Sequence, residues 1–306
     1  MSHAPGEPTN PPSESPYAIR LRNVVKRFGD QTVLDGIDLD IREGETMVVM
    51  GCSGSGKSTV LRHMIGSLKP DAGTIEVLGG DVTAMKEAEL NEVRKKIGIL
   101  FQSGALFNSM SLRENVALPL QEHTQLDPST IDIMVKIKLE LVDLRKHAEK
   151  YPGQLSGGMK KRAGLARALA LDPRILFYDE PSAGLDPVTS AGIDQLIIGL
   201  SKQLGVTSVV VTHEMDSAFV IADRMCMLDK GKILRTESRR YFERIRDTEE
   251  PLDDEEALIR QFLRGDAEGP LTRRKEETNY AEDLLGEPDP RKRPRPAVQA
   301  TRAVSA

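Results

Sequence analysis

The segment that decides the fold reads Gly51-Cys52-Ser53-Gly54-Ser55-Gly56-Lys57-Ser58. It fits the spacing G-x-x-x-x-G-K-[ST] at every fixed position, and this pattern indicates a nucleotide-binding P-loop when a strand precedes it and a helix follows it. Residues 46–50 are a short apolar run typical of a buried strand, and residues 57–67 carry apolar side chains at helical spacing. A Gly/Ser loop that fits the pattern by chance is disfavoured because both neighbours are present.

The chemistry of this segment is that of a phosphate-binding loop. Glycines let the backbone turn successive N–H groups toward phosphate oxygens, and the start of the next helix adds partial positive charge. We expect Lys57 to bridge the β- and γ-phosphates of a bound nucleotide and the Ser58 hydroxyl to coordinate Mg²⁺. The predicted nucleotide contacts of this segment are Gly51, Cys52, Ser53, Gly54, Ser55, Gly56, Lys57, Ser58 and Thr59.

A second candidate site element is an apolar strand that ends in two carboxylates. Residues 175–178 are followed by Asp179 and Glu180. Ligands of parallel sheets bind at the carboxyl ends of the strands, so these charges fall where a ligand is expected. We expect Asp179 to bind Mg²⁺ and Glu180 to polarise the attacking water. An exposed Asp-Glu turn is the alternative, and the P-loop upstream disfavours it.

The composition excludes several classes of protein. The chain has 306 residues and a formal net charge of -5, which argues against a dedicated nucleic-acid binder. No apolar run approaches the roughly 18–20 residues of a membrane span. The two cysteines, Cys52 and Cys226, show no metal-ligand spacing and fit a reduced, cytosolic setting. Residues 1–16 are rich in Pro and Ser without an apolar core, so we expect a disordered leader rather than a secretory signal.

The pattern along the chain predicts an α/β fold. Residues 17–49 read as short strands, and the alternation of strands and helices that follows implies a largely parallel sheet with crossover helices. Residues 103–165 have helical patterning and predict an inserted helical region. In it we expect a helix over residues 131–144. Its predicted apolar face is formed by Ile133, Met134, Ile137, Leu141 and Leu144.

The C-terminal part is predicted to be an extension to a domain that spans residues 17–245. Residues 253–264 carry an apolar stripe at helical spacing, at positions 258, 259, 262 and 263. Residues 266–306 have the composition of a disordered segment. Two alternatives are open: an arm that docks on a second copy or a regulatory subunit, and contact of the basic cluster at 291–295 with anionic lipid headgroups.

Further motifs, in order along residues 17–240, resemble those of the ATP-binding subunits of ABC transporters. The run Leu155-Ser156-Gly157-Gly158-Met159 is similar to the family signature, with Met where most members have Gln. Ser182-Ala183-Gly184-Leu185-Asp186 is similar to the D-loop. Gln102, His213 and Phe28 stand where the family has its Q-loop glutamine, its switch histidine and an aromatic residue that stacks on adenine.

This resemblance implies a fold and a set of roles. The fold is a P-loop NTPase (RecA-like) core with an N-terminal antiparallel β-subdomain and an inserted α-helical subdomain. Two copies pair head to tail, so Ser156, Gly157 and Gly158 contact the ATP of the other copy. Gln102 senses Mg²⁺, as a ligand, and the attacking water, and His213 contacts the γ-phosphate. A structural His213 and a core Phe28 are the alternatives.

Three basic residues, Lys160, Lys161 and Arg162, fall in the first turn of the helix that is predicted after the signature. Positive charge is unfavourable at the N-terminus of a helix. Proximity to phosphate or to an acidic partner would offset this cost.

The flanks of the signature point to one subfamily. Residues 155–168, 101–107 and 111–116 are similar to the ATPases of lipid transporters that work with MCE-domain proteins, the Mla type. The resemblance implies phospholipid transport across the cell envelope, powered from the cytoplasmic face of the inner membrane by a peripheral subunit. The implied partners are a membrane permease, an MCE-domain protein and, as a further candidate, a small regulatory subunit.

Two alternatives remain. One is the ATPase of an ABC transporter for a small polar solute. The other is an ABC-type ATPase of translation or DNA repair. The second is disfavoured because the chain has a single cassette, no sustained heptads and no basic, aromatic-rich surface for nucleic acid.

Apolar residues between Ala105 and Leu112 lie in a predicted surface loop, where the family receives a short helix of the membrane subunit. We therefore expect Phe107→Asp to abolish transport while basal ATP hydrolysis is unchanged, because the charge faces the partner and not the nucleotide. Transport and ATPase rates in reconstituted membranes measure this, and undiminished transport would refute it.

Overall fold

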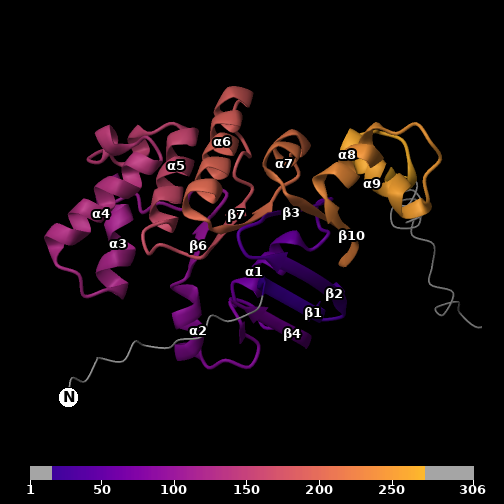
Figure 1. Ribbon diagram of the computed structural model, residues 1–306, viewed down its shortest axis with the longest axis horizontal. Coiled ribbons are helices and arrows are strands. Elements are labelled where there is room, and N and C mark those ends of the chain that lie inside the picture. The colour runs from indigo at the N-terminus through magenta and orange to yellow at the C-terminus, as the bar shows by residue number, and fades with distance from the viewer. Residues whose placement is uncertain (1–15, 273–306) are drawn as a thin grey trace, which may run out of the picture. The chain divides into compact units, whose positions relative to one another are not determined.

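The computed structural model describes residues 16–272 (Figure 1). The chain divides into two compact units, residues 1–249 and residues 250–306, and each is described by itself. The expected leader at residues 1–16 lies outside the described residues except for its last position. Residues 273–306, which include the basic cluster at 291–295, lie outside them as well.

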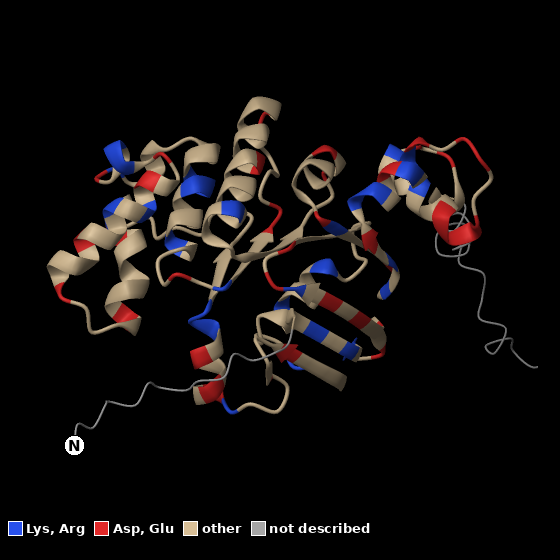
Figure 2. Ribbon diagram, viewed as in Figure 1, with Lys and Arg blue, Asp and Glu red and all other residues tan. Residues whose placement is uncertain are grey.

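A four-stranded antiparallel sheet opens the first unit. Strand β1 (Tyr17–Phe28) pairs with β2 (Gln31–Arg42) and with β4 (Ala72–Val77), and β4 pairs with β5 (Gly80–Asp81). Gly29, with φ 58°, lies in the turn between β1 and β2. One face carries the buried aliphatic side chains, and charges of both signs lie side by side on the strands (Figure 2). Arg22–Asp40 is one of these ion pairs, at 2.6 Å.

The central sheet has six strands in the order β10-β9-β3-β8-β7-β6. Strands β3, β6, β7, β8 and β9 run parallel, and β10 pairs antiparallel with β9. Their bounds are β3 Thr46–Gly51, β6 Ile97–Leu100, β7 Ile175–Asp179, β8 Thr207–Val211, β9 Arg224–Asp229 and β10 Lys232–Ser238. Strands β3 and β8 are buried along their whole length, which explains their unbroken apolar and Thr/Ser sequences.

Helices of the first unit fall into two groups. Around the sheets lie α1 (Lys57–Met64), α2 (Glu87–Arg94), α6 (Pro187–Leu204), α7 (Met215–Ile221) and α8 (Arg239–Asp247). The others are α3 (Leu112–His123), α4 (Pro128–Leu141) and α5 (Gly157–Ala168), with 3-10 turns at Arg145–His147 and Pro152–Gln154. Helices α3, α4 and α5 pack on one another, and α5 also packs on β6 and α6. The helical region thus extends past residue 165, the end that the sequence predicted.

Local sequence explains where these helices begin. Ser111 caps α3 and forms a capping box with Glu114. Asp127 and Asp186 cap α4 and α6, and each is followed by a proline in the first turn.

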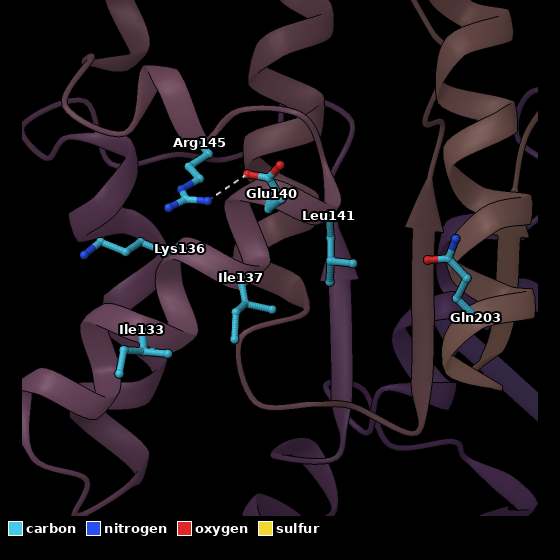
Figure 3. Close-up of a pocket in the computed structure, with 7 residues that line it drawn as sticks. All are labelled: Ile133, Lys136, Ile137, Glu140, Leu141, Arg145 and Gln203. Atoms are coloured by element: carbon cyan, nitrogen blue, oxygen red, sulfur yellow. Dashed lines mark ion pairs between the residues drawn. The ribbon is translucent and has the colours of Figure 1, made fainter.

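The predicted face of α4 is wrong at Ile133 and Ile137, whereas Leu144, just past the end of the helix, is buried as predicted. The buried side chains are Ile131, Val135, Lys138 and Leu139. Ile133 is 58% exposed and Ile137 is 52% exposed, and both line a surface hollow with Leu141 and, from α6, Gln203 (Figure 3). The helix has two apolar stripes, and packing against α3 and α5 selected the other one.

The second unit contains α9 (Asp254–Arg264), which begins at the cap Asp253 and ends at Gly265 in a left-handed conformation. The Gln261 side chain donates to Thr272 Oγ1 (2.7 Å) and accepts from the backbone N–H of Leu271 (2.7 Å). Residues 266–272, part of the segment expected to be disordered, therefore have defined partners on α9. No helix between residues 16 and 272 is long and apolar enough to cross a membrane.

The two stripes of α4 allow a matched test of the packing. Leu139→Ala and Ile137→Ala remove the same number of atoms, but Leu139 is fully buried and Ile137 half exposed. We expect Leu139→Ala to lower the free energy of unfolding by about 3 kcal/mol and Ile137→Ala by less than about 1 kcal/mol. Denaturant unfolding of both variants measures this. A larger loss of unfolding free energy in Ile137→Ala than in Leu139→Ala would mean that the stripe with Ile137 is the buried one.

Candidate functional site

Parallel pairing brings the predicted site segments to one edge of the central sheet. The P-loop follows β3, Asp179 ends β7, His213 follows β8, and Gln102 follows β6. Because these strands run parallel, their carboxyl ends meet at the same edge. The segments that the sequence predicted to act together therefore lie together, although Gly51 and His213 are 162 residues apart.

The glycines of the P-loop are required by their neighbours. A Cβ atom at Gly51 would lie 2.1 Å from the carbonyl oxygen of Leu228 on β9, and one at Gly56 would lie 2.8 Å from a methyl group of Leu34 on β2. Gly54 has open space around it but a φ of +77°, which favours glycine. The loop thus presents bare backbone at the start of α1, where N–H groups without helical acceptors suit phosphate oxygens.

Lys57 lies across this loop. Its Nζ donates to the carbonyl oxygens of Gly51 (2.7 Å) and Cys52 (3.0 Å). Burial lowers the pKa of the Lys57 ammonium, and the nearby Glu180, Cys52 and Asp179 act in the opposite direction. The loop, its lysine and the two carboxylates of β7 therefore form one electrostatic cluster.

Glu180 has an unusual backbone and well-defined partners. Its φ is +50°, in the left-handed region that non-glycine residues rarely adopt. Its N–H donates to the Val211 carbonyl (2.9 Å), and its carbonyl accepts from Lys161 Nζ (2.7 Å). Its side chain, Oε1, lies 2.8 Å from Nδ1 of His213. The structure therefore brings the predicted pair Glu180 and His213 into direct contact.

Asp179 lies beside Glu180 at the end of β7. Burial raises the pKa of the Asp179 carboxyl, the neighbouring Glu180 raises it further, and Arg62, Lys161 and Lys57 oppose this. With Ser58 and Gln102, Asp179 would offer hydroxyl, amide and carboxylate oxygens, the hard donors that Mg²⁺ takes together with phosphate and water. Among the described residues, no group of three His, Cys, Asp or Glu is placed to hold a metal.

The signature residues lie in a different neighbourhood. Ser156 caps α5 by accepting from the N–H of Met159 (3.3 Å). Gly158 is packed so closely on α6 that a Cβ would lie 2.4 Å from the Thr189 methyl group. Helix α5 packs on α3, α4, α6 and β6, whereas α1 packs on β2, β3, β4 and β8. The signature and the P-loop of one chain thus belong to different parts of the unit.

Phe28 lies at the end of β1, and half of its surface is exposed. The Lys26 ammonium lies 5.5 Å from the ring centroid and also pairs with Asp71 at 3.0 Å. This exposure excludes a role in the core, and stacking on adenine stays a prediction.

A buried polar cluster was missed from the sequence. Asp194 on α6 accepts from Ser217 on α7 (2.8 Å) and from Ser182 in the D-loop (3.4 Å). It is 5% exposed, and burial raises the pKa of its carboxyl against the opposing effect of the two hydroxyl donors. The cluster connects the segment that follows Glu180, through Ser182, to the segment that follows His213, through Ser217. A lone Asp in a helix gives no sequence signal for such a role, because most face solvent.

Comparison with known proteins assigns the family. The family described as "ABC transporter" matches residues 34–183. The chain is 42% identical over 268 residues to the probable ribonucleotide transport ATP-binding protein mkl of Mycobacterium leprae, covering 87% of this chain and 75% of that protein. It is 41% identical over 267 residues to the intermembrane phospholipid transport system ATP-binding protein MlaF of Escherichia coli K12, covering 87% and 96%. The chain belongs to the ABC transporter family.

Solved structures agree with this family. The dimeric post-hydrolysis structure of the ATP-binding cassette MJ0796 with ADP and Pi matches with a TM-score of 0.67 and 34% identity, over 72% of this chain and 99% of that one. The structure of cbiO1 from Clostridium perfringens, part of the transporter complex cbiONQ, matches with a TM-score of 0.70 and 25% identity, over 86% and 99%. The predicted P-loop NTPase fold and ATPase class are thereby confirmed for this ABC cassette.

The buried Asp194 of this ABC cassette predicts a pH effect on stability. Its pKa is raised in the folded state, so its stabilising effect is present below the ordinary Asp pKa of about 4 and is lost as pH rises. We expect Asp194→Asn to raise the free energy of unfolding at pH 7.5 by on the order of 1 kcal/mol, and to give no gain near pH 4.

Urea unfolding at both pH values measures this effect, with Asp186→Asn as the control. The Asp186 pKa is lowered by the Thr189 hydroxyl and N–H at the helix cap, so Asp186→Asn should lose stability at pH 7.5. A loss of stability at pH 7.5 in Asp194→Asn would contradict the prediction.

Proposed function

We propose that this chain is the ATP-hydrolysing subunit of an ABC transporter that moves phospholipid across the cell envelope, with a membrane permease and an MCE-domain protein as partners. The observation that carries the proposal is the match at 41% identity to 96% of the length of a phospholipid transport ATPase. The residues around the signature and Gln102, which resemble the lipid-transporting subfamily, support it.

The geometry of the cluster suggests how hydrolysis proceeds. ATP lies with its phosphates on residues 51–59 and its adenine on Phe28. Lys57 would neutralise the β- and γ-phosphates, while Ser58, Asp179 and Gln102 would hold Mg²⁺, which would supply further charge neutralisation. Glu180 accepts a hydrogen bond from the attacking water, and the contact with His213 limits the directions its carboxylate can take.

The complete site requires a second copy. Ser156, Gly157 and Gly158 begin α5, and the exposed Ser156 and Gly157 offer backbone to a phosphate that the P-loop of their own chain does not hold. We propose that they contact the γ-phosphate on the partner's P-loop, in a head-to-tail pair. The dimeric state named for the MJ0796 cassette supports this arrangement.

The lipid pathway lies in the proposed permease, because no described helix could span a membrane. We place this subunit on the cytoplasmic face of the inner membrane. Phe101 and Phe107 are 45% and 50% exposed near Gln102, and the Arg167 guanidinium lies 5.8 Å from the Phe107 ring centroid. These exposed rings suit a short apolar helix of the permease, so its movement would reach Gln102 directly.

A second candidate substrate is a ribonucleotide or a similar polar solute. The mycobacterial relatives at 41–42% identity carry the name of a probable ribonucleotide transport protein. Their match covers 72–75% of their length, less than that of the phospholipid transport relative.

Reconstitution with the permease and MCE-domain protein distinguishes these substrates. We expect ATP-dependent transfer of labelled phospholipid between vesicles, and no uptake of labelled ribonucleotide. Glu180→Gln should still bind ATP, hydrolyse it at least about 100-fold more slowly and accumulate as a closed pair, because a neutral amide polarises the attacking water far less than a carboxylate does.

The control is Glu237→Gln on β10, which removes an exposed carboxylate opposite Met225 at the amino end of β9, away from the site, and should keep hydrolysis within about threefold. Near-normal ATP turnover in Glu180→Gln would show that Glu180 does not polarise the attacking water. Ribonucleotide uptake without phospholipid transfer would favour the second substrate.

A further inference from the structure

Lys161 is a buried lysine beneath the candidate catalytic carboxylate. It lies on α5 and is 5% exposed. An ammonium removed from water is costly unless it is hydrogen-bonded and near negative charge. Lys161 meets both conditions: its Nζ donates to the Glu180 carbonyl at 2.7 Å, and the carboxylates of Glu214, Glu180 and Asp179 counter the lowering of its pKa by burial.

The acceptor of this bond is the residue with the strained backbone. A left-handed φ on a non-glycine residue is energetically unfavourable and persists only where the surroundings hold it. Glu180 is held on both sides, by its own N–H to the Val211 carbonyl (2.9 Å) and by Lys161 at its carbonyl. The same residue then directs its carboxylate to His213.

The helix that carries Lys161 is itself anchored. A Cβ at Gly164 would lie 2.8 Å from the Gly104 carbonyl oxygen, so α5 and the segment after Gln102 touch backbone to backbone. Arg167 of the same helix donates to the carbonyl oxygens of Ala105 (2.8 Å) and Gly104 (3.2 Å). Lys161 therefore reaches Glu180 from a fixed point rather than from a mobile surface.

We propose that Lys161 is a positioning residue: from the helix that begins at the signature, it fixes the peptide of Glu180 and thereby the direction of the carboxylate that orients the attacking water. This inference rests on the proposed role of Glu180. It concerns Glu180 of the same chain, whereas the signature on that helix serves the ATP of the other chain. Positioning and damage to the signature therefore affect different sites of the pair.

The first test is Lys161→Met, which keeps the length and apolar stem of the side chain but removes the donor. We expect ATP affinity to stay within about twofold and the single-turnover hydrolysis rate to fall at least about tenfold. The control is Lys138→Met on α4, because Lys138 is equally buried and bonds a single carboxylate, Asp172. It should keep the rate within about twofold.

The decisive test uses mixed pairs, made from two differently tagged copies, in which Glu180→Gln silences one site. In the first pair, Lys161→Met stands in the chain with intact Glu180. In the second, Lys161→Met and Glu180→Gln stand in the same chain. Single-turnover hydrolysis is measured because it does not require the pair to reopen, and the reference pair carries Glu180→Gln alone in one chain.

We expect the first pair to be at least about tenfold slower than the reference and the second to match it within about twofold. No slowing of the first pair would mean that Lys161 does not position Glu180, and slowing of the second pair alone would place the damage in the signature helix. Equal slowing of both pairs would mean that the effect is not confined to Glu180 of the same chain. Each of these results overturns the inference. A homodimer of Glu180→Gln that hydrolyses normally would instead refute the proposed function, independently of Lys161.

Discussion

Parallel pairing of β3, β8 and β7 is the constraint on which the rest of the structure depends. These strands are buried, so their backbone groups must find partners within the sheet, and the register leaves little freedom. The pairing sets the P-loop, the two carboxylates of β7 and His213 along one edge. It also explains the glycines, because β9 and β2 approach Gly51 and Gly56 too closely for any side chain. The position of the candidate site thus follows from how the strands of the sheet pair.

The edge concentrates charge that must be balanced. Asp179 and Glu180 are adjacent and partly buried. Burial and the neighbouring Glu180 carboxylate raise the pKa of Asp179. Two lysines interact electrostatically with these carboxylates. Lys57 lies on the helix that follows the P-loop, and Lys161 lies on the helix that begins at the signature. The second is the more informative, because it connects the signature helix, which we propose serves the partner's nucleotide, with the backbone of Glu180, which we propose serves its own. In the proposed pair, the two sites are then linked through each chain.

Sequence patterns predicted best what local chemistry dictates. The P-loop spacing, the carboxylates at the end of β7 and the signature motif depend on residues close together in the chain, and the family comparison agrees with them. The sequence pattern led to a wrong prediction where the local sequence was compatible with two structures. Helix α4 has two apolar stripes, and only its packing on α3 and α5 decided which is buried. Residues 266–272 have a disorder-like composition, yet Gln261 supplies partners for them.

The sequence by itself determined the class of the protein, because a phosphate-binding loop needs a fixed order of glycines, lysine and serine that few other functions require. It also predicted which residues carry the chemistry. Only the tertiary structure decided the partners of Glu180, its left-handed backbone and the buried Asp194 cluster. The physical reason is that these contacts join residues 19 to 33 positions apart on different elements. The free energy that these contacts contribute depends on burial, because hydrogen bonds and charges that are removed from water must find partners within the protein.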